Sequence, residues 1–568
     1  MRVLPACCIL CSLIASAASL PPARLKNLNL RVAMRDGVRL STNVFRPDVK
    51  TRVPTVLVRT PYGKGADLAP TYEPFIQRGY AVVLQDVRGR YASGGVFQPF
   101  SQEGPDGYDT LDWIAAQPWS DGKVGMIGGS YLGIAQWKVA LHNNPHLKAI
   151  SPVVSGYDDY RDRFYSPGGA MKLGHRLLWM SLNLTAPGFT PPAFDRFVLH
   201  LPLRTSDRAA TGKTSEMWQR SAEHPAYDSF WRSMSVRAQI DRVHVPSLAF
   251  GGWYDNFAQS DLEAYSALKA AAEPHRVVIG PWPHNMSIKF PGADFGAHSS
   301  MPVRAMQLDW MDYWLKGKSS ALIASAPVKI FVMGADEWRE EREWPLARAR
   351  PTRYYLSAAK AANSIEGDGR LSSRPPAQQP SDQFVFDPRN PVPTRGGSVC
   401  CNPAVFPWGP LDQRPVERRP DVLVYTSHAL RKDLEVTGPV RVVLHVSTSA
   451  PDTDFTAKLV DVFPDGEARH LTDGILRLRY RDSLEKAAPA TPGKIYRISI
   501  DAGVTSNVFR KGHRIRLEVS SSNFPRFDRN PNTGRPVIDE TELRKASQTV
   551  YHDRSRESYV LLPVIPRK

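Results

Sequence analysis

Short apolar runs alternate with amphipathic segments over the first quarter of the chain. Residues 53–58 and 81–84 are continuous apolar runs rich in valine, a pattern typical of strands buried on both faces of a sheet. The segment 109–117 places its apolar residues on one helical face. This alternation predicts an α/β domain with a largely parallel sheet.

The pattern changes beyond residue 155. Longer helical stretches rich in Met, Leu, Trp and Phe fill the region 156–241, which we interpret as a helical insertion. Strand-like runs return at 247–250 and 276–279, so the α/β domain resumes there. We therefore expect two halves of one domain, 27–155 and 242–325, with the helical segment as a cap between them.

The last part of the chain is rich in β-forming residues and punctuated by turns. Strand-like runs recur at short intervals from 328–332 to 515–519. This density of short strands predicts an antiparallel β-sandwich of jelly-roll type over 326–568.

The amino terminus has the features of a secretory signal peptide. A positive Arg2 precedes an apolar stretch over 3–14, and the small residues 15–18 follow it. The apolar stretch is shorter than the ~20 residues that span a bilayer, and no later segment reaches that length. We therefore expect a signal peptide over 1–18, no membrane span, and a secreted or periplasmic protein.

The composition is that of a globular protein with a basic surface. Lys and Arg exceed Asp and Glu by 73 − 56 = 17 charges. No basic run with interleaved aromatic residues occurs, so a nucleic-acid partner is not expected. No phosphate-binding glycine loop and no H-E-x-x-H zinc helix occurs, so neither a cofactor nor a metal is expected. A homodimer is left open.

Only two of the five cysteines lie outside the expected signal peptide, the adjacent pair Cys400 and Cys401. Neighbouring cysteines cannot join distant parts of the chain. They can form a vicinal disulfide, half of a metal site, or two buried thiols. Because no His or Cys is near them in the sequence, buried thiols are the favoured interpretation.

One turn has the character of a nucleophile elbow. The strand-like residues 124–127 lead into Gly128-Gly129-Ser130-Tyr131-Leu132-Gly133, and a helical segment follows. Such a turn points a serine hydroxyl away from the sheet at the start of a helix, and it needs small residues where strand and helix crowd together. The pattern departs from G-x-S-x-G, because Leu132 stands where the second glycine is usual. Ser130 is the candidate nucleophile.

The partners of this serine follow it in the order that the fold requires. Asp255 comes after the strand-like run 247–250, and His284 comes after 276–279. The carboxyl ends of parallel strands meet at one edge of a sheet, so we expect these two residues close to Ser130. His284 would act as general base, and Asp255 would orient its ring.

The oxyanion of an acyl-transfer reaction needs donors fixed in advance. One is expected from the backbone N–H of Tyr131, the residue after the nucleophile. The other is expected from the loop over 59–65, where the phenol of Tyr62 is the natural donor.

Nine collinear segments give the chain a family resemblance. It resembles the cocaine esterase-like acyl hydrolases of the CocE/NonD type, within the serine peptidase family S15 that also holds X-Pro dipeptidyl-peptidases. The segments are 36–40, 59–63, 86–90, 128–133, 251–255, 280–284, 331–334, 336–338 and 452–464. In this family the elbow reads G-x-S-Y-x-G, so the departure at Leu132 supports the resemblance.

The resemblance implies an α/β-hydrolase fold with a helical cap and a carboxyl-terminal jelly roll. It also implies Ser130, Asp255 and His284 as the triad, with Tyr62 and Tyr131 as the oxyanion hole. Substrate-pocket positions are implied as well, and they are Phe164, Trp179, Phe257, Cys400 and Cys401. At the last two the family has bulkier apolar residues, so the fit of the pocket to cocaine itself is not implied.

The expected activity is hydrolysis of small carboxylic esters or amides through an acyl-enzyme. The alternatives are an X-Pro dipeptidyl-peptidase and an α-amino-acid ester hydrolase or acylase. Both alternatives need a carboxylate near the nucleophile to pair with the substrate's ammonium group. Asn256, Phe257 and Ala258 offer none after the acid, which leaves Asp158, Asp159 or Asp162 as substitutes.

Overall fold

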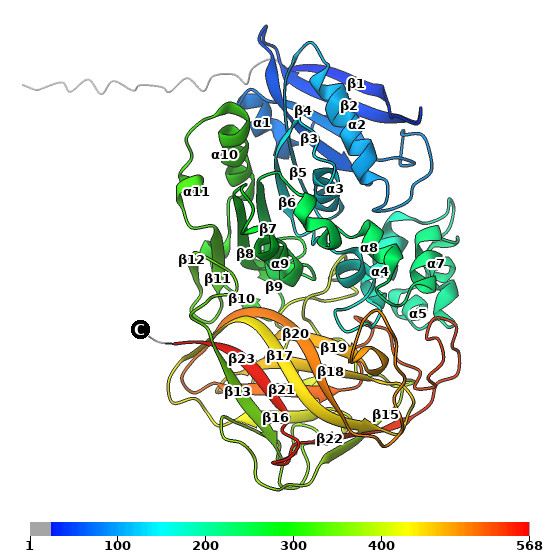
Figure 1. Cartoon of the computed structure of the whole chain (residues 1–568), viewed down its shortest axis with the longest axis vertical. Coiled ribbons are helices and arrows are strands. Elements are labelled where there is room, and N and C mark those ends of the chain that lie inside the picture. Colours follow the sequence, from blue (N-terminus) through cyan, green and yellow to red (C-terminus); the bar gives the residue numbers. More distant parts are fainter. Residues whose placement is uncertain (1–23, 567–568) are drawn as a thin grey trace, which may run out of the picture.

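The computed structural model describes residues 24–566, so the expected signal peptide over 1–18 lies outside the described part. Figure 1 shows an elongated molecule with an α/β domain at one end, a β domain at the other, and a helical cap beside the junction. The fold expected from the sequence, an α/β hydrolase followed by a largely antiparallel β domain, is confirmed.

The first sheet has ten strands in the order β1-β2-β4-β3-β5-β6-β7-β8-β11-β12. Neighbours from β4 to β11 run parallel, whereas β1, β2 and β12 pair antiparallel at the two edges. The strands are β1 Arg24–Ala33, β2 Arg39–Pro47, β3 Val53–Thr60, β4 Ala81–Asp86, β5 Ser120–Gly129, β6 Leu147–Val153, β7 Ser247–Tyr254, β8 His275–Pro283, β11 Val328–Val332 and β12 Glu337–Glu341.

Helices cover both faces of this sheet. Alternate residues of β3 point to opposite sides: Leu57 packs in the core under α2 and α3, and Val56 packs in the core under α1 and α10. The helices that flank the sheet are α1 Glu73–Gln77, α2 Glu103–Ala115, α3 Tyr131–Ala140, α9 Ala258–Leu268, α10 Val303–Lys316 and α11 Ala321–Ala324. A small hairpin, β9 Lys289–Phe290 with β10 Ala293–Asp294, lies outside the sheet.

One strand belongs to a different sheet from the one predicted. The sequence assigned 328–332 to the carboxyl-terminal sandwich, and that assignment is wrong. The segment is β11, which pairs parallel with β8 and antiparallel with β12. It is apolar at almost every position, as in either kind of strand, so only the pairing partner decides its sheet.

The cap surrounds its own apolar core. Short helices gather around Trp218 and Trp231, which are both almost completely buried. The cap elements are the π-helix Asp159–Phe164, α4 Leu173–Asn183, α5 Phe194–Val198, α6 Ser206–Thr211, α7 Glu216–Glu223 and α8 Ser229–Met234.

The carboxyl-terminal part forms an eleven-stranded and largely antiparallel sheet around the largest apolar core. Its strands are β13 Arg350–Ser357, β14 Arg370–Ser372, β15 Asp382–Phe386, β16 Leu423–Ser427, β17 Leu434–Thr448, β18 Asp454–Val462, β19 Ala468–Arg477, β20 Tyr496–Phe509, β21 Arg514–Ser520, β22 Ala546–Tyr551 and β23 Tyr559–Ile565. A single turn of helix, α12 Arg414–Glu417, precedes β16.

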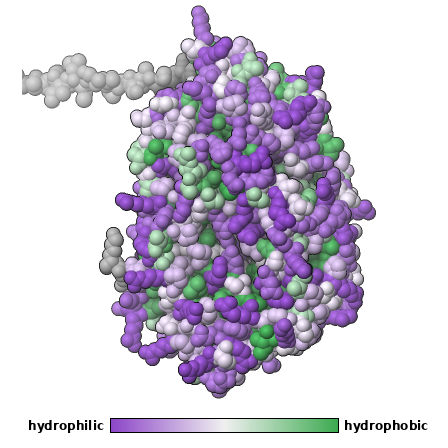
Figure 2. Space-filling model, viewed as in Figure 1, coloured by the Kyte–Doolittle hydropathy of each residue, from purple (hydrophilic) through white to green (hydrophobic). Residues whose placement is uncertain are grey.

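The face drawn in Figure 2 is mostly hydrophilic, with hydrophobic residues scattered singly or in small groups. Among the described residues, no helix combines the length and the apolar character needed to cross a bilayer.

Candidate active site

The elbow holds Ser130 in a strained conformation between β5 and α3. Ser130 has φ 55° and ψ −124°, a region that side-chain-bearing residues rarely adopt. Two neighbouring glycines are required because any side chain at these positions would clash with an adjacent residue. A Cβ on Gly128 would lie 2.5 Å from Leu132 Cβ, and one on Gly133 would lie 2.6 Å from Ser155 Cβ. The shifted second glycine therefore lets α3 approach the segment after β6.

Asp255 and His284 follow neighbouring parallel strands. Tyr254 at the end of β7 pairs with Pro283 at the end of β8, so the next residue of each strand reaches the same edge. His284 Nδ1 lies 2.6 Å from Asp255 Oδ1, and His284 Nε2 lies 3.0 Å from Ser130 Oγ. Asp255 is only 1% exposed, so solvent does not compete for its carboxylate. The structure thus brings the three residues into one hydrogen-bonded chain.

Tyr62 lies beside this chain, in the loop that follows β3. Its hydroxyl accepts a hydrogen bond of 3.0 Å from Trp179 Nε1 on α4, which orients the phenol. Burial raises the pKa of Tyr62, so the group stays protonated and keeps a proton to donate. The Tyr131 amide opens α3, where backbone N–H groups have no helical acceptor. Both expected oxyanion donors therefore flank Ser130.

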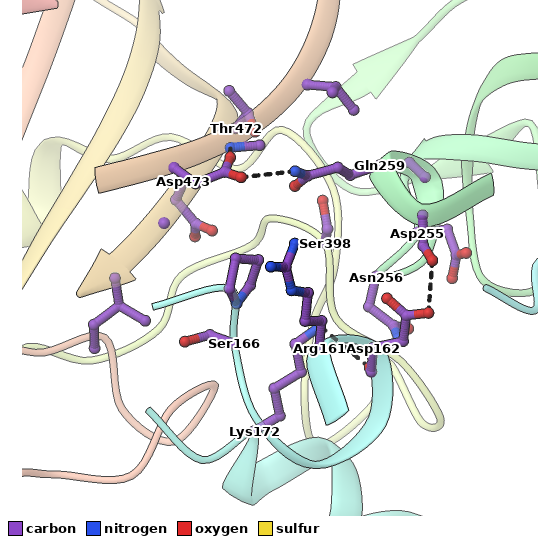
Figure 3. Close-up of a pocket in the computed structure, with 18 of the residues that line it drawn as sticks. Arg161, Asp162, Ser166, Lys172, Asp255, Asn256, Gln259, Ser398, Thr472 and Asp473 are labelled. Atoms are coloured by element: carbon purple, nitrogen blue, oxygen red, sulfur yellow. Dashed lines mark hydrogen bonds between the residues drawn. The ribbon is translucent and has the colours of Figure 1, made fainter. Parts of the chain in front are cut away.

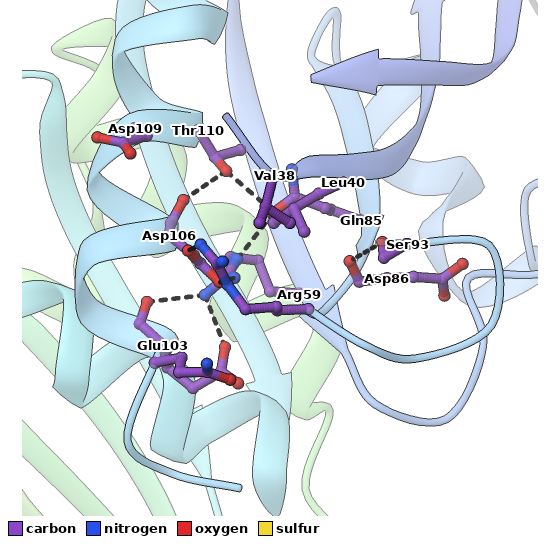
Figure 4. Close-up of polar contacts among 12 residues, drawn as sticks. Val38, Leu40, Arg59, Gln85, Asp86, Ser93, Glu103, Asp106, Asp109 and Thr110 are labelled. Atoms are coloured by element: carbon purple, nitrogen blue, oxygen red, sulfur yellow. Dashed lines mark hydrogen bonds and ion pairs between the residues drawn. The ribbon is translucent and has the colours of Figure 1, made fainter. Parts of the chain in front are cut away.

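A buried ionic network holds the hydroxyl of Tyr131. It was not predicted from the sequence. The Tyr131 hydroxyl donates to Glu103 Oε1 at 2.8 Å, and Arg59 Nη1 donates to Glu103 Oε2 at 2.7 Å. Figure 4 shows Arg59 reaching from β3 between Glu103 and Asp106 of α2. Burial raises the pKa of Glu103, and the Arg59 cation opposes that shift.

Removing the cation of this network should destabilise the fold. We expect Arg59→Met to lower the free energy of unfolding by about 3–5 kcal/mol, because Glu103 is left buried without its counter-ion. Arg35→Met is the control, since Arg35 pairs with Asp109 at the surface and its loss should cost less than about 1 kcal/mol. Urea denaturation measures both. Equal losses in the two variants would contradict the expectation.

Aromatic rings cluster around Tyr131 of the elbow. The Trp179 ring stacks on the Tyr131 ring, with centroids 6.2 Å apart and planes 6° apart. Phe164 lies in the same apolar cluster, and the Phe257 ring lies 5.7 Å from the His284 ring. The structure adds Phe100, whose ring lies 4.9 Å from that of Tyr131. No motif marks Phe100 in the sequence, because its position depends on the loop before α2.

The cysteine pair differs from the favoured interpretation. Cys400 and Cys401 are joined in a vicinal disulfide, so the expectation of two buried thiols is wrong. A histidine is also close, although none is near in sequence. A ring nitrogen of His175, from α4, and both sulfurs lie within 4.8 Å of one another. Because the disulfide occupies both sulfurs, neither is a thiolate ligand in this form. Cys401 packs against the cap cluster that contains Phe164 and Trp179.

The three aspartates considered as ammonium ligands are all engaged within the protein. Asp159 pairs with Lys138 at 2.5 Å and with Arg163 at 3.0 Å. One oxygen of Asp162 accepts bonds from two backbone amides and from a serine hydroxyl. Asp158 caps the π-helix, and burial raises its pKa to about 6.

Asp162 borders a polar cavity that does not include the nucleophile. Figure 3 shows Asp162 and Lys172 of the cap around the same cavity as Asp255, Asn256 and Asp473. Ser130 is not among the residues that line it. Asp162 therefore lies on the Asp255 side of the site.

Comparison with known proteins agrees with this geometry. Residues 36–286 match the X-Pro dipeptidyl-peptidase (S15 family) profile, and residues 322–561 match the X-Pro dipeptidyl-peptidase C-terminal non-catalytic domain. The cocaine esterase of Rhodococcus sp. (strain MB1 Bresler) is 39% identical over 567 residues, covering 95% of this chain and 98% of the relative. The chain belongs to the CocE/NonD hydrolases. The resemblance inferred from the nine segments is confirmed, and the protein is a serine hydrolase.

Two solved structures with similar folds carry other activities in their names. An aminopeptidase from a marine sediment Thaumarchaeota archaeon has a TM-score of 0.83 and 28% identity, covering 96% of this chain and 97% of its own. An α-amino acid ester hydrolase has a TM-score of 0.83 and 27% identity, covering 96% and 98%. Membership in the CocE/NonD hydrolases therefore does not by itself determine the acyl group of the substrate.

Proposed function

We propose that this CocE/NonD hydrolase cleaves small carboxylic esters through an acyl-enzyme on Ser130. The observation that carries the proposal is the chain of contacts at 3.0 and 2.6 Å that links the serine hydroxyl to the imidazole and the imidazole to a buried carboxylate. These distances allow proton transfer without rearrangement.

The reaction follows from the geometry. Ser130 Oγ attacks the ester carbonyl as its proton passes to His284 Nε2, and Asp255 stabilises the imidazolium that forms. The tetrahedral oxyanion accepts hydrogen bonds from the Tyr62 hydroxyl and the Tyr131 amide. The imidazolium then protonates the leaving alkoxide, and the acyl group stays on Ser130. Water, deprotonated by His284, releases the acid in the reverse sequence.

Esters are favoured over aminated substrates because the three aspartates considered as ammonium ligands are each engaged within the described part of the chain. A substrate ammonium group buried near Ser130 would need a carboxylate, and Asp158, Asp159 and Asp162 are already hydrogen-bonded or paired. Binding the ammonium group of a dipeptide or an amino-acid ester in this site would therefore bury a charge without a partner.

A substrate panel tests this proposal. We expect p-nitrophenyl butyrate and phenyl benzoate to be cleaved with a higher kcat/KM than phenylglycine methyl ester and Gly-Pro-p-nitroanilide. Faster cleavage of the dipeptide anilide would contradict the proposal and indicate an X-Pro dipeptidyl-peptidase.

Export is part of the same proposal, and the apolar segment 3–14 with the small residues after it supports it. Amino-terminal sequencing of protein recovered from the periplasm or medium tests this part. A sequence that still begins at Met1 would contradict it.

The phenol of Tyr62 should raise kcat by about 100-fold. We expect Tyr62→Phe to lower kcat about 100-fold with little change in KM, because it removes one oxyanion donor and leaves the ring in place. Trp179→Phe is the matched control: it removes the indole that orients the phenol and leaves the donor itself, so a smaller loss is expected. An unchanged kcat in Tyr62→Phe would exclude the phenol from the oxyanion hole.

A further inference from the structure

The aromatic cluster next to Tyr131 contains a buried cation. Arg176 lies on α4, one turn before Trp179, and only 3% of it is exposed. Its guanidinium carbon is 4.3 Å from the centroid of the Phe164 ring, 5.4 Å from that of Trp179 and 5.3 Å from that of Phe100. Two of these three rings belong to the substrate pocket that the family resemblance implies. The cation therefore lies among rings that the resemblance assigns to the substrate pocket.

Arg176 has no anionic partner in the described part of the chain. Its Nε and one terminal nitrogen donate to the backbone oxygen of Arg163, at 3.4 and 3.1 Å, and no carboxylate lies within ion-pair distance. Two other deeply buried arginines differ in this respect. Arg59 lies 2.7 Å from Glu103, and Arg477 lies 2.9 Å from Asp454. A buried guanidinium without a counter-ion destabilises the protein, and a bound anionic group would offset that cost.

The acidic groups around it cannot supply the missing charge. Asp159 is shared between Lys138 and Arg163, so it faces two cations before Arg176 is counted. Burial, and next the Arg163 cation, lowers the pKa of Arg176 to about 9, which leaves it charged at neutral pH. Arg176 thus has the Arg163 cation as a neighbour, and the nearby Asp159 carboxylate is already paired with two other cations.

We propose that Arg176 binds a carboxylate at the far end of the substrate's acyl group, so that monoesters of dicarboxylic acids are the preferred substrates. This inference rests on the proposed esterase function and extends it to a substrate class. The guanidinium presents a planar set of donors that matches a carboxylate in a bidentate pair. The rings of Phe164 and Trp179 would pack against the methylene chain between that carboxylate and the ester carbonyl. The charge preference is then the opposite of the one that aminated substrates require.

A competing role for Arg176 is electrostatic support of the oxyanion. Tyr62 and Tyr131, which flank Ser130, both lie close enough to raise the pKa of Arg176. In that role the arginine would assist every ester equally, whereas carboxylate binding assists only the acidic ones. The ratio of kcat/KM between an acidic ester and its neutral match therefore separates the two.

The experiment compares monophenyl succinate, glutarate and adipate with their methyl phenyl diesters, by phenol release from the full-length protein. We expect the best acidic ester to exceed its neutral match in kcat/KM by about tenfold or more, as for a charge-assisted pair. Arg176→Met should abolish that preference, so that the ratio of kcat/KM between the acidic ester and its neutral match falls to about one. Arg176→Lys should retain part of the preference, and it also serves if the methionine variant does not fold.

Arg196→Met is the control, because Arg196 is an exposed arginine of the same cap, and its substrate ratio should match that of the unaltered protein. An unaltered protein that cleaves acidic and neutral esters equally well would overturn the proposal. A loss in Arg176→Met that is the same for both esters would overturn it too. Absence of phenol release from every ester would instead contradict the proposed esterase function.

Discussion

Ser130→Ala should abolish ester hydrolysis almost completely, with kcat lower by about 10⁴- to 10⁶-fold. The loss is this large because no other group can form the acyl-enzyme, and the oxyanion donors alone give only a small residual rate. The substitution removes one oxygen from a half-exposed position, so the fold should be retained. Steady-state release of p-nitrophenol from p-nitrophenyl butyrate measures the effect.

A burst experiment adds a direct test of the covalent step. With excess p-nitrophenyl butyrate, the unaltered protein should acquire the mass of one butyryl group, and Ser130→Ala should not. The matched control is Ser266→Ala on α9, whose hydroxyl donates to the backbone oxygens of Leu262 and Trp344, away from the site. Its kcat should be unchanged. Equal rates for Ser130→Ala and the unaltered protein would remove Ser130 from the mechanism.

Asp255→Asn should lower kcat by about 10⁴-fold while KM changes little. The carboxylate accepts the Nδ1 proton of His284 over 2.6 Å, which leaves the Nε2 lone pair facing Ser130. An amide in its place can donate to Nδ1, so the proton moves to Nε2 and the ring can no longer take the serine proton. The amide also fails to stabilise the imidazolium.

The β domain offers a matched control for this second variant. His552 Nε2 lies 2.7 Å from Asp382 Oδ2, in another buried aspartate–histidine pair. Asp382→Asn should affect stability and leave kcat near that of the unaltered protein. A similar fall in kcat in both variants would mean that the effect of Asp255→Asn comes from a disturbed fold.

The candidate nucleophile, base and acid could be predicted because each one follows a strongly patterned strand. β7 and β8 are buried along their whole length and β5 is buried over its second half, so each contains a continuous apolar run that leads to the end of the strand. Ser130, Asp255 and His284 stand immediately after those ends, and parallel strands deliver their carboxyl ends to one edge. The chain order and the topology rule were therefore sufficient to expect the three together.

The strand β11 shows that an apolar pattern predicts a buried strand but not the sheet to which it belongs. Its apolar pattern predicts a buried strand, and the structure agrees, but the pattern does not name the neighbour with which it pairs. Proximity in the chain to the later strands suggested the β-sandwich, whereas pairing with β8 places it in the first sheet. Register and partner depend on how the whole sheet assembles.

The sequence by itself determined the fold class, the family and the three strand-end residues, because these depend on local periodicity and on chain order. Only the tertiary structure decided the surroundings of the nucleophile. It placed His175 beside Cys400 and Cys401 and enclosed Arg176 among aromatic rings without a counter-ion. These relations join residues far apart in the chain, or depend on which groups pack around one side chain. No periodic pattern encodes them, since they arise when the cap and the two sheets pack together.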